Sequence, residues 1–180
     1  MKPWQVIEQL ESDNSRTFKE QLIEAQATAG NDEFFLGVRL ALDNLITFGI
    51  KQVPVSARDG AGLSYDQFTN VVNQLVARSL TGNAARDEID ALMAQATQDQ
   101  WNLWYRRILI KDLRCGVTEK TINTALKRAK KSSYTIPVFE CQLAHDSANH
   151  QGKLTGQRQI ETKLDGVRVL TMVYPGGRVD

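Results

Sequence analysis

Apolar residues recur every three or four positions through the first part of the chain, up to about residue 130. This spacing places side chains on one face of an α-helix, whereas the strict alternation of a half-buried strand is nearly absent there. Residues that favour helix starts, and glycines that favour helix ends, separate the apolar stretches. The pattern therefore predicts an all-helical region built from consecutive helices.

Two helices are predicted before the pattern breaks between residues 49 and 62. Asn14 or Ser15 can cap a helix that ends near Ala29, where Gly30 follows. Asp32 can begin the second helix. Five apolar residues are expected to share one face of this second helix: Phe35, Val38, Leu42, Leu45 and Ile46.

Two more helices are predicted directly after the break. Ser64 and Gln67 have the spacing of a capping box, and the helix that they begin is expected to end near Leu80. A shorter helix is predicted after Asn83. The apolar stripe of the first of these two helices contains Phe68, Val71, Val72, Leu75 and Val76.

Two further helices complete the region. Thr97 and Gln100 form another capping pair, and Thr118 can cap a last helix that runs through Lys127. The helix that begins at Thr97 carries Trp101, Trp104, Tyr105 and Ile108. We interpret this aromatic cluster as core packing in preference to a platform on which nucleic-acid bases stack.

The composition changes at Ser132, after which the chain is polar and irregular, and Pro137 forbids a continuous helix. Residues 160–164 and 168–174 are rich in strand-forming residues, but a few strands cannot bury enough apolar surface to be stable alone. The predicted fold class is mostly α. It comprises an all-helical domain over residues 1–131, a linker and lead-in segment over 132–159, and the first strands of a second domain over 160–180.

Composition narrows the class of protein. No apolar run approaches the roughly 20 residues of a membrane span, and acidic residues interrupt the N-terminal stretch that a signal peptide needs to be apolar. We therefore expect a cytoplasmic protein with no membrane contact. The spacing of Cys115, Cys141, His145 and His150 does not suit a metal site, so reduced thiols and a surface loop are expected instead.

Charge is distributed unevenly along the chain, although the net charge is only +1. Residues 1–100 hold 8 Lys and Arg against 14 Asp and Glu, whereas residues 101–133 hold 9 against 2. Such a basic segment indicates either a surface that faces a polyanion or a basic helix that is merely solvated. The charge pattern leaves both interpretations open.

One lysine near the C-terminal end has the setting of a nucleophile. The sequence KLDGVR places Lys163 between a β-rich stretch and a tight turn shaped by Asp165 and Gly166. A lysine amine is reactive only when its pKa falls well below about 10.4, which a pocket or neighbouring cations can bring about. The alternative is an exposed lysine beside a hairpin turn.

Several segments together resemble one enzyme family. KLDGVR, with Glu161 two residues before the lysine, resembles motif I of the covalent nucleotidyltransferases, which include ATP-dependent DNA ligases, RNA ligases and messenger-RNA capping enzymes. Residues 108–123, ILIKDLRCGVTEKTIN, resemble a stretch of the DNA-binding domain of ATP-dependent DNA ligases. Residues 80–92, LTGNAARDEIDAL, are similar to a segment in ligases of T-even-type bacteriophages. The stretch IPVFECQLA is loosely similar to the segment before motif I, with Cys141-Gln142 in place of the usual pair.

This resemblance implies a chemistry and a site for ATP. Lys163 would attack the α-phosphate of ATP and release pyrophosphate. The AMP would then pass to a DNA 5′-phosphate, and the adjacent 3′-hydroxyl would displace it. Glu161 and the backbone around Thr162 would contact adenine, while Arg168 would lie by the ribose and the nick.

Mg²⁺ is the second cofactor that the resemblance implies, because phosphoryl transfer needs cations that neutralise developing charge. The metal-binding carboxylates of the family lie in later motifs, so we expect no metal ligand up to Asp180. Residues 160–180 would then be the incomplete start of an α+β nucleotidyltransferase (adenylation) domain. Alone, the chain is expected to bind DNA but not to ligate it.

Nicked double-stranded DNA is the expected macromolecular partner. Gly82 before Asn83, and Gly116 ahead of Thr118, precede helix starts whose unsatisfied N–H groups favour phosphates. Each glycine also fits a plain helix end, and each basic residue also fits a solvated charge. The basic residues expected to contact phosphates are Arg78, Arg114, Lys120, Lys127 and Arg128, extended by Lys130 and Lys131.

Other functions stay open at this point. The chain can be a non-catalytic DNA-binding or partner-docking module in which KLDGVR has no role, or part of an RNA ligase. NAD as the donor of AMP is disfavoured, because nothing in the N-terminal helices resembles the nicotinamide-recognition domain of NAD-dependent ligases. A monomer is expected, and the sequence does not decide whether a sliding clamp is a partner.

Overall fold

A computed structural model of the chain describes residues 1–138, 147–153, 155–157, 171, 173 and 175–177. The chain divides into two compact units, Met1–Glu140 and Cys141–Asp180. Within these described residues the protein is mostly helical and contains no extended sheet, so the predicted fold class is confirmed for this part. No helix among them is long and apolar enough to cross a membrane.

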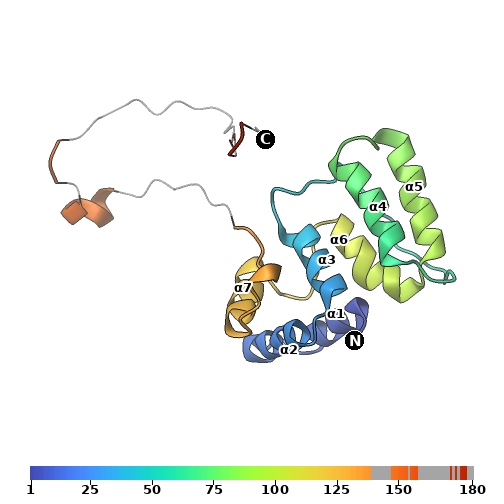
Figure 1. Ribbon diagram of the computed structural model, residues 1–180, viewed down its shortest axis with the longest axis horizontal. Helices are drawn as coiled ribbons and strands as arrows, with labels where there is room; N and C mark the ends of the chain where they lie inside the picture. Colours follow the sequence, from blue (N-terminus) through green and yellow to red (C-terminus); the bar gives the residue numbers. More distant parts are fainter. Residues whose placement is uncertain (139–146, 154, 158–170, 172, 174, 178–180) are drawn as a thin grey trace. The chain divides into compact units, whose positions relative to one another are not determined.

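The described residues of the first unit form seven α-helices, a short π-helical segment and one 3-10 turn, Ser132–Tyr134 (Figure 1). Helix α2 packs on α7, α3 on α6, α4 on α5, and α1 on the π-helical segment η1. The bounds of these elements are α1 Pro3–Ser12, α2 Arg16–Thr28, α3 Asp32–Leu42, α4 Tyr65–Val76, α5 Gly82–Gln95, η1 Gln100–Tyr105, α6 Arg106–Leu109 and α7 Glu119–Arg128.

Local capping fixes several of the helix starts. The Ser15 hydroxyl accepts the Phe18 N–H at 3.4 Å, as predicted. At the start of α4, the Ser64 hydroxyl accepts the Gln67 N–H at 3.3 Å, and the Gln67 side chain accepts the Ser64 N–H at 3.2 Å. This reciprocal pair confirms the predicted capping box, because both otherwise unpaired N–H groups gain an acceptor.

The core of the unit is aromatic, as the sequence analysis predicted. Trp104 is fully buried, and its ring stacks on that of Phe34 with centroids 5.7 Å apart. Tyr105 contacts Phe68 of α4, with ring centroids 4.4 Å apart. A Cβ added to Gly37 of α3 would lie 2.2 Å from the Trp104 ring, so only glycine leaves room for the indole at this crossing.

Three helix boundaries differ from the predictions. Helix α3 stops at Leu42, so Leu45 lies outside it and is 43% exposed. Helix α4 ends at Val76 and not near Leu80, because a turn begins at Ala77. Helix α5 begins at Gly82 and spans 14 residues, so the prediction of a shorter helix there was wrong. From Ala84 to Gln95 most of its residues are good helix formers, and the helix ends at the β-region cap Ala96.

A long connection between α3 and α4 is held against the helices that follow it. The Trp101 indole donates to the Pro54 carbonyl at 2.9 Å, and the Arg106 guanidinium donates to the Val53 carbonyl at 3.0 Å. Further along, the Gly60 N–H donates to the Ala96 carbonyl at 2.9 Å. These bonds fix the connection in place beside α5.

The segment after α7 begins as part of the helical unit. Ile136 is buried, and its backbone N–H and C=O both bond the Asn123 side chain at 2.9 Å. The Tyr134 ring stacks on Phe35 with centroids 4.4 Å apart. The lead-in predicted over residues 132–159 therefore starts packed on the helices. The strands predicted over 160–164 and 168–174 lie, apart from residues 171 and 173, outside the described residues.

Candidate nucleic-acid interface

Much of the basic segment over residues 101–133 has a structural role. The buried Arg107 guanidinium donates to the Glu11 carboxylate and to the Leu113 carbonyl, both at 2.8 Å. It also donates to the Asn102 carbonyl at 3.2 Å. Since these partners come from three parts of the chain, Arg107 connects α1 to the turn that precedes α7.

Lys111 connects the ends of two helices in the same way. Its ammonium donates to the Leu40 carbonyl at 2.9 Å and to the Asp43 carbonyl at 2.5 Å, and it lies 5.6 Å from the centre of the Phe48 ring. Burial lowers the pKa of Lys111, while the charge of Asp43 acts in the opposite direction. This lysine of the ligase-like stretch thus satisfies carbonyls at the end of α3.

Arg128, which was predicted to contact DNA, pairs with carboxylates of α2. Its guanidinium lies 2.5 Å from a Glu20 oxygen and 3.5 Å from a Glu24 oxygen. Hydrogen bonding from Arg16 is the main cause that lowers the pKa of Glu20, and Arg128 adds to it against the opposing effect of burial. The structure therefore gives Arg128 a role in joining α7 to α2.

The start of α5 is open around its first residue, Gly82. Gly82 has φ +63°, and a Cβ added to it would meet no atom within 4 Å. The N-cap residue Thr81 makes no side-chain hydrogen bond to the first turn. The first N–H groups of α5 therefore have no side-chain cap.

The start of α7 also combines a positive-φ glycine with a threonine N-cap, although here the glycine lies two residues before the cap. Gly116 has φ +65°, and the N-cap residue Thr118 makes no side-chain hydrogen bond to the first turn. Behind the glycine lies the buried Lys19, whose ammonium donates to the Cys115 carbonyl at 2.7 Å. A Cβ on Gly116 would come within 2.9 Å of this ammonium. The buried ammonium of Lys19 thus stabilises the backbone of this turn from the core side.

These two starts differ from those of α2, α3 and α4. Ser15, Asn31 and Ser64 each accept a hydrogen bond from the first turn of their own helix. The threonines at the starts of α5 and α7 do not, although threonine is a common cap. We refer to the first turns that follow Thr81 and Thr118 as the uncapped starts. Such turns combine unpaired N–H groups with the positive end of the helix dipole, which favours a phosphate.

The remaining predicted cations lie at exposed positions near helix ends. Lys127 lines a hollow of about 540 Å³ together with Lys130 and Lys131. Arg114 lies 3.7 Å from the Asp112 carboxylate, and both side chains are more than half exposed. Lys120 is the second residue of α7 and so belongs to the uncapped start that follows Thr118. Arg114 and four lysines therefore lie at the protein surface: Lys120, Lys127, Lys130 and Lys131, the last three beside the hollow.

Arg78 lies between α4 and α5 and lines a cavity of about 320 Å³. Lys51 and Arg86 line the same cavity, and the sequence analysis had not selected either of them. A signal for Arg86 exists in the sequence, because it follows Gly82 by four residues and so shares its helix face. No feature of the sequence around Lys51 indicates that it lines this cavity.

The proposed nucleotide-binding residues cannot be placed in the same way. Lys163, Glu161, Thr162 and Arg168 lie outside the described residues. Among the residues that are described, no group of three or more His, Cys, Asp or Glu could hold a metal ion. Burial raises the pKa of Cys115 to about 11, so this thiol stays protonated near neutral pH.

The chain is similar to solved structures whose names point to one kind of enzyme. No protein-family model and no curated protein matches the chain. Two solved structures, named "Pmar-Lig_Pre." and "Pmar-Lig_PreS3", each share 50% sequence identity with it at a TM-score of 0.79. The match covers 95% of this chain but only 39% of each of those chains. Both names carry the abbreviation Lig, so the comparison supports a ligase-related protein.

Proposed function

We propose that this chain is the DNA-binding N-terminal part of an ATP-dependent DNA ligase of the T-even bacteriophage type. The observation that carries the proposal is the pair of uncapped starts, at α5 and α7. A glycine with positive φ, Gly82, is the first residue of one start, and another, Gly116, lies two residues before the N-cap of the other. Both starts lie in segments that resemble ligase sequences. The ligase-like names of two structures at 50% identity support the same family.

The proposed binding mode follows from the chemistry of these helix starts. Backbone N–H groups and exposed lysines recognise phosphates but not bases, so they hold a duplex without reading its sequence. A ligase needs this property, because nicks occur in any sequence. Glycines 82 and 116 carry no side chain that would keep the DNA backbone away from the N–H groups.

Salt dependence tests this mode of binding. We expect the chain to bind a nicked duplex at low salt and to lose affinity steeply as salt rises, because each neutralised phosphate contributes about 0.9 to the slope of log K against log salt. With three to five phosphates as an order-of-magnitude expectation, the slope is about −3 to −5. Fluorescence anisotropy of a labelled duplex measures it.

Three comparisons make the salt experiment decisive. Two duplexes of unrelated sequence should bind within a few-fold of each other, and a strong preference for one of them would contradict phosphate recognition. A nicked RNA duplex bound as tightly as nicked DNA would favour the RNA-ligase alternative. Absence of binding at low salt would leave a partner-docking role for the helices.

The catalytic part of the proposal rests on the resemblance around Lys163. In the longer enzyme, the Lys163 amine would form a bond to the α-phosphorus of ATP as pyrophosphate leaves, with Glu161 and Thr162 at the adenine and Arg168 at the ribose. Mg²⁺ would neutralise the phosphate charges during this transfer, held by carboxylates of later family motifs. This chain would supply the nucleophilic amine and the DNA-binding helices.

A further inference from the structure

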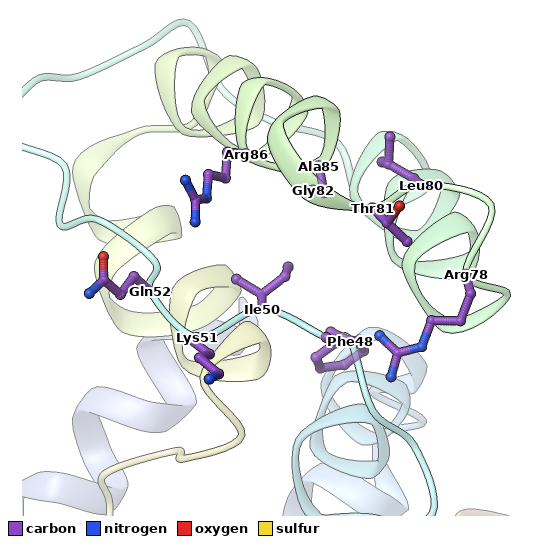
Figure 2. Close-up of a pocket in the computed structure, with 11 residues that line it drawn as sticks. Phe48, Ile50, Lys51, Gln52, Arg78, Leu80, Thr81, Gly82, Ala85 and Arg86 are labelled. Carbon is purple, nitrogen blue, oxygen red and sulfur yellow. The ribbon is translucent and has the colours of Figure 1, made fainter.

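A cavity of about 320 Å³ lies where residues 48–52, the end of α4 and the start of α5 meet (Figure 2). Three cationic side chains line it: Lys51, Arg78 and Arg86. No aspartate or glutamate is among its lining residues. The Gly82 end of α5 also borders it, so the positive end of that helix adds to the potential of the cations.

Arg78 is held in an unfavourable backbone conformation that directs its guanidinium to this cavity. Its φ is +59°, at the position after α4 where glycine or asparagine is preferred. The guanidinium donates to the Thr47 hydroxyl at 2.8 Å. It also lies against Gly49, where an added Cβ would come within 1.9 Å of one guanidinium nitrogen. Non-glycine residues in this backbone region cluster at ligand-binding and other functional sites, which agrees with a position that faces a ligand.

The other two cations are not used inside the protein. Lys51 and Arg86 are exposed, and neither side chain forms a hydrogen bond or ion pair in the part of the chain that the structure describes. Figure 2 shows Arg78 and Arg86 on opposite sides of the cavity, with Ile50 between them. Asp90 lies one turn further along α5 and lines a neighbouring hollow with Arg86. The cavity itself thus keeps an unopposed positive charge.

We infer that this cavity holds a backbone phosphate of DNA, bound between Arg78 and Arg86 beside the uncapped start of α5, with Lys51 at its rim. The inference rests on the proposed function and extends it to two residues, Lys51 and Arg86. Charge complementarity carries it, because a phosphodiester presents one negative charge on oxygens that guanidinium groups bind well. A cavity of this kind makes no contact with bases and adds no sequence preference.

Two variants and one matched control test the inference in the salt series of duplex binding. Arg86→Gln removes one cation from the cavity, and we expect it to weaken binding several-fold at every sequence and to reduce the salt slope by about one. Arg39→Gln removes the same charge from the exposed face of α3 and is expected to leave the slope unchanged. Arg78→Gly is the second variant. Glycine suits the positive φ, so its thermal midpoint should be kept while DNA affinity falls.

The outcomes separate the two claims. If the unsubstituted chain binds the duplex but Arg86→Gln and Arg78→Gly bind like Arg39→Gln, the cavity does not hold phosphate and the proposed function stands. If the unsubstituted chain does not bind, both fail. A rise in the thermal midpoint with millimolar inorganic phosphate, absent in Arg86→Gln and accompanied by unchanged DNA affinity, would assign the cavity to free phosphate and overturn the DNA assignment.

Discussion

Trp104→Ala is expected to lower the free energy of unfolding by about 3–5 kcal/mol, the usual cost of removing a buried tryptophan. Trp104 is fully buried and stacks on Phe34, and its ring edge fills the space left by Gly37. Alanine would leave a cavity at the crossing of α3 with the aromatic segment, because helices packed to this density cannot close it. Urea unfolding followed by circular dichroism measures the change.

A milder substitution at the same position serves as the control. The Trp104 indole N–H has no hydrogen-bond acceptor among the described residues, so Trp104→Phe removes an unsatisfied donor as well as ring volume. We therefore expect it to cost much less than alanine, on the order of 1–2 kcal/mol. Equal stability of Trp104→Ala and the unsubstituted chain would contradict the packing described for this core.

In the longer ligase that we propose, Lys163→Ala is expected to abolish transfer of label from ATP that carries a radioactive α-phosphate. The proposed step forms a bond from the lysine nitrogen to phosphorus, and alanine offers no nucleophile for it. Labelled protein on a denaturing gel is the measurement, and the label of the variant should fall to background. Pyrophosphate added afterwards should remove the label from the unsubstituted enzyme, because the step is reversible.

Another lysine of the same unit provides the control for this experiment. Lys153→Ala removes an amine that belongs to no motif of the family, so labelling should continue at the unsubstituted level. Labelling of Lys163→Ala at that level would show that the amine of Lys163 is not the acceptor. The DNA-binding proposal would be unaffected, because it depends on helices that end before residue 131.

Features that depend on neighbouring residues were predictable from the sequence. The caps at Ser15 and at Ser64 with Gln67 form between residues three apart, and the structure confirms both. The glycines before Asn83 and Thr118 were expected to precede helix starts. Gly116 does so, whereas Gly82 is itself the first residue of α5, and both adopt positive φ. The lack of a side-chain cap at those starts could not be predicted. A capping hydrogen bond from threonine depends on the rotamer of its side chain, which the sequence does not determine.

Contacts between distant residues account for most of what was missed. Arg107 pairs with Glu11 across 96 positions, and Lys111 reaches the Leu40 carbonyl across 71. No neighbouring residue in the sequence distinguishes such paired cations from surface cations. The sequence therefore suggested that more side chains of the basic segment are available to contact DNA than the structure leaves unpaired. All four non-glycine residues with positive φ in the described part are basic: Arg78, Lys111, Arg114 and Lys130. Each follows a helix or lies in a turn, and only the fold shows this pattern.

The uncapped starts of α5 and α7 are the central claim, and backbone-amide NMR shifts on addition of a nicked duplex test them most directly. We expect the largest changes at the amides of Gly82, Asn83 and Glu119, because phosphates would bond these N–H groups. The amides of Tyr65 and Asp66, at the capped start of α4, should change little. Saturable binding with its largest changes at α4, and none at the starts of α5 and α7, would contradict the account.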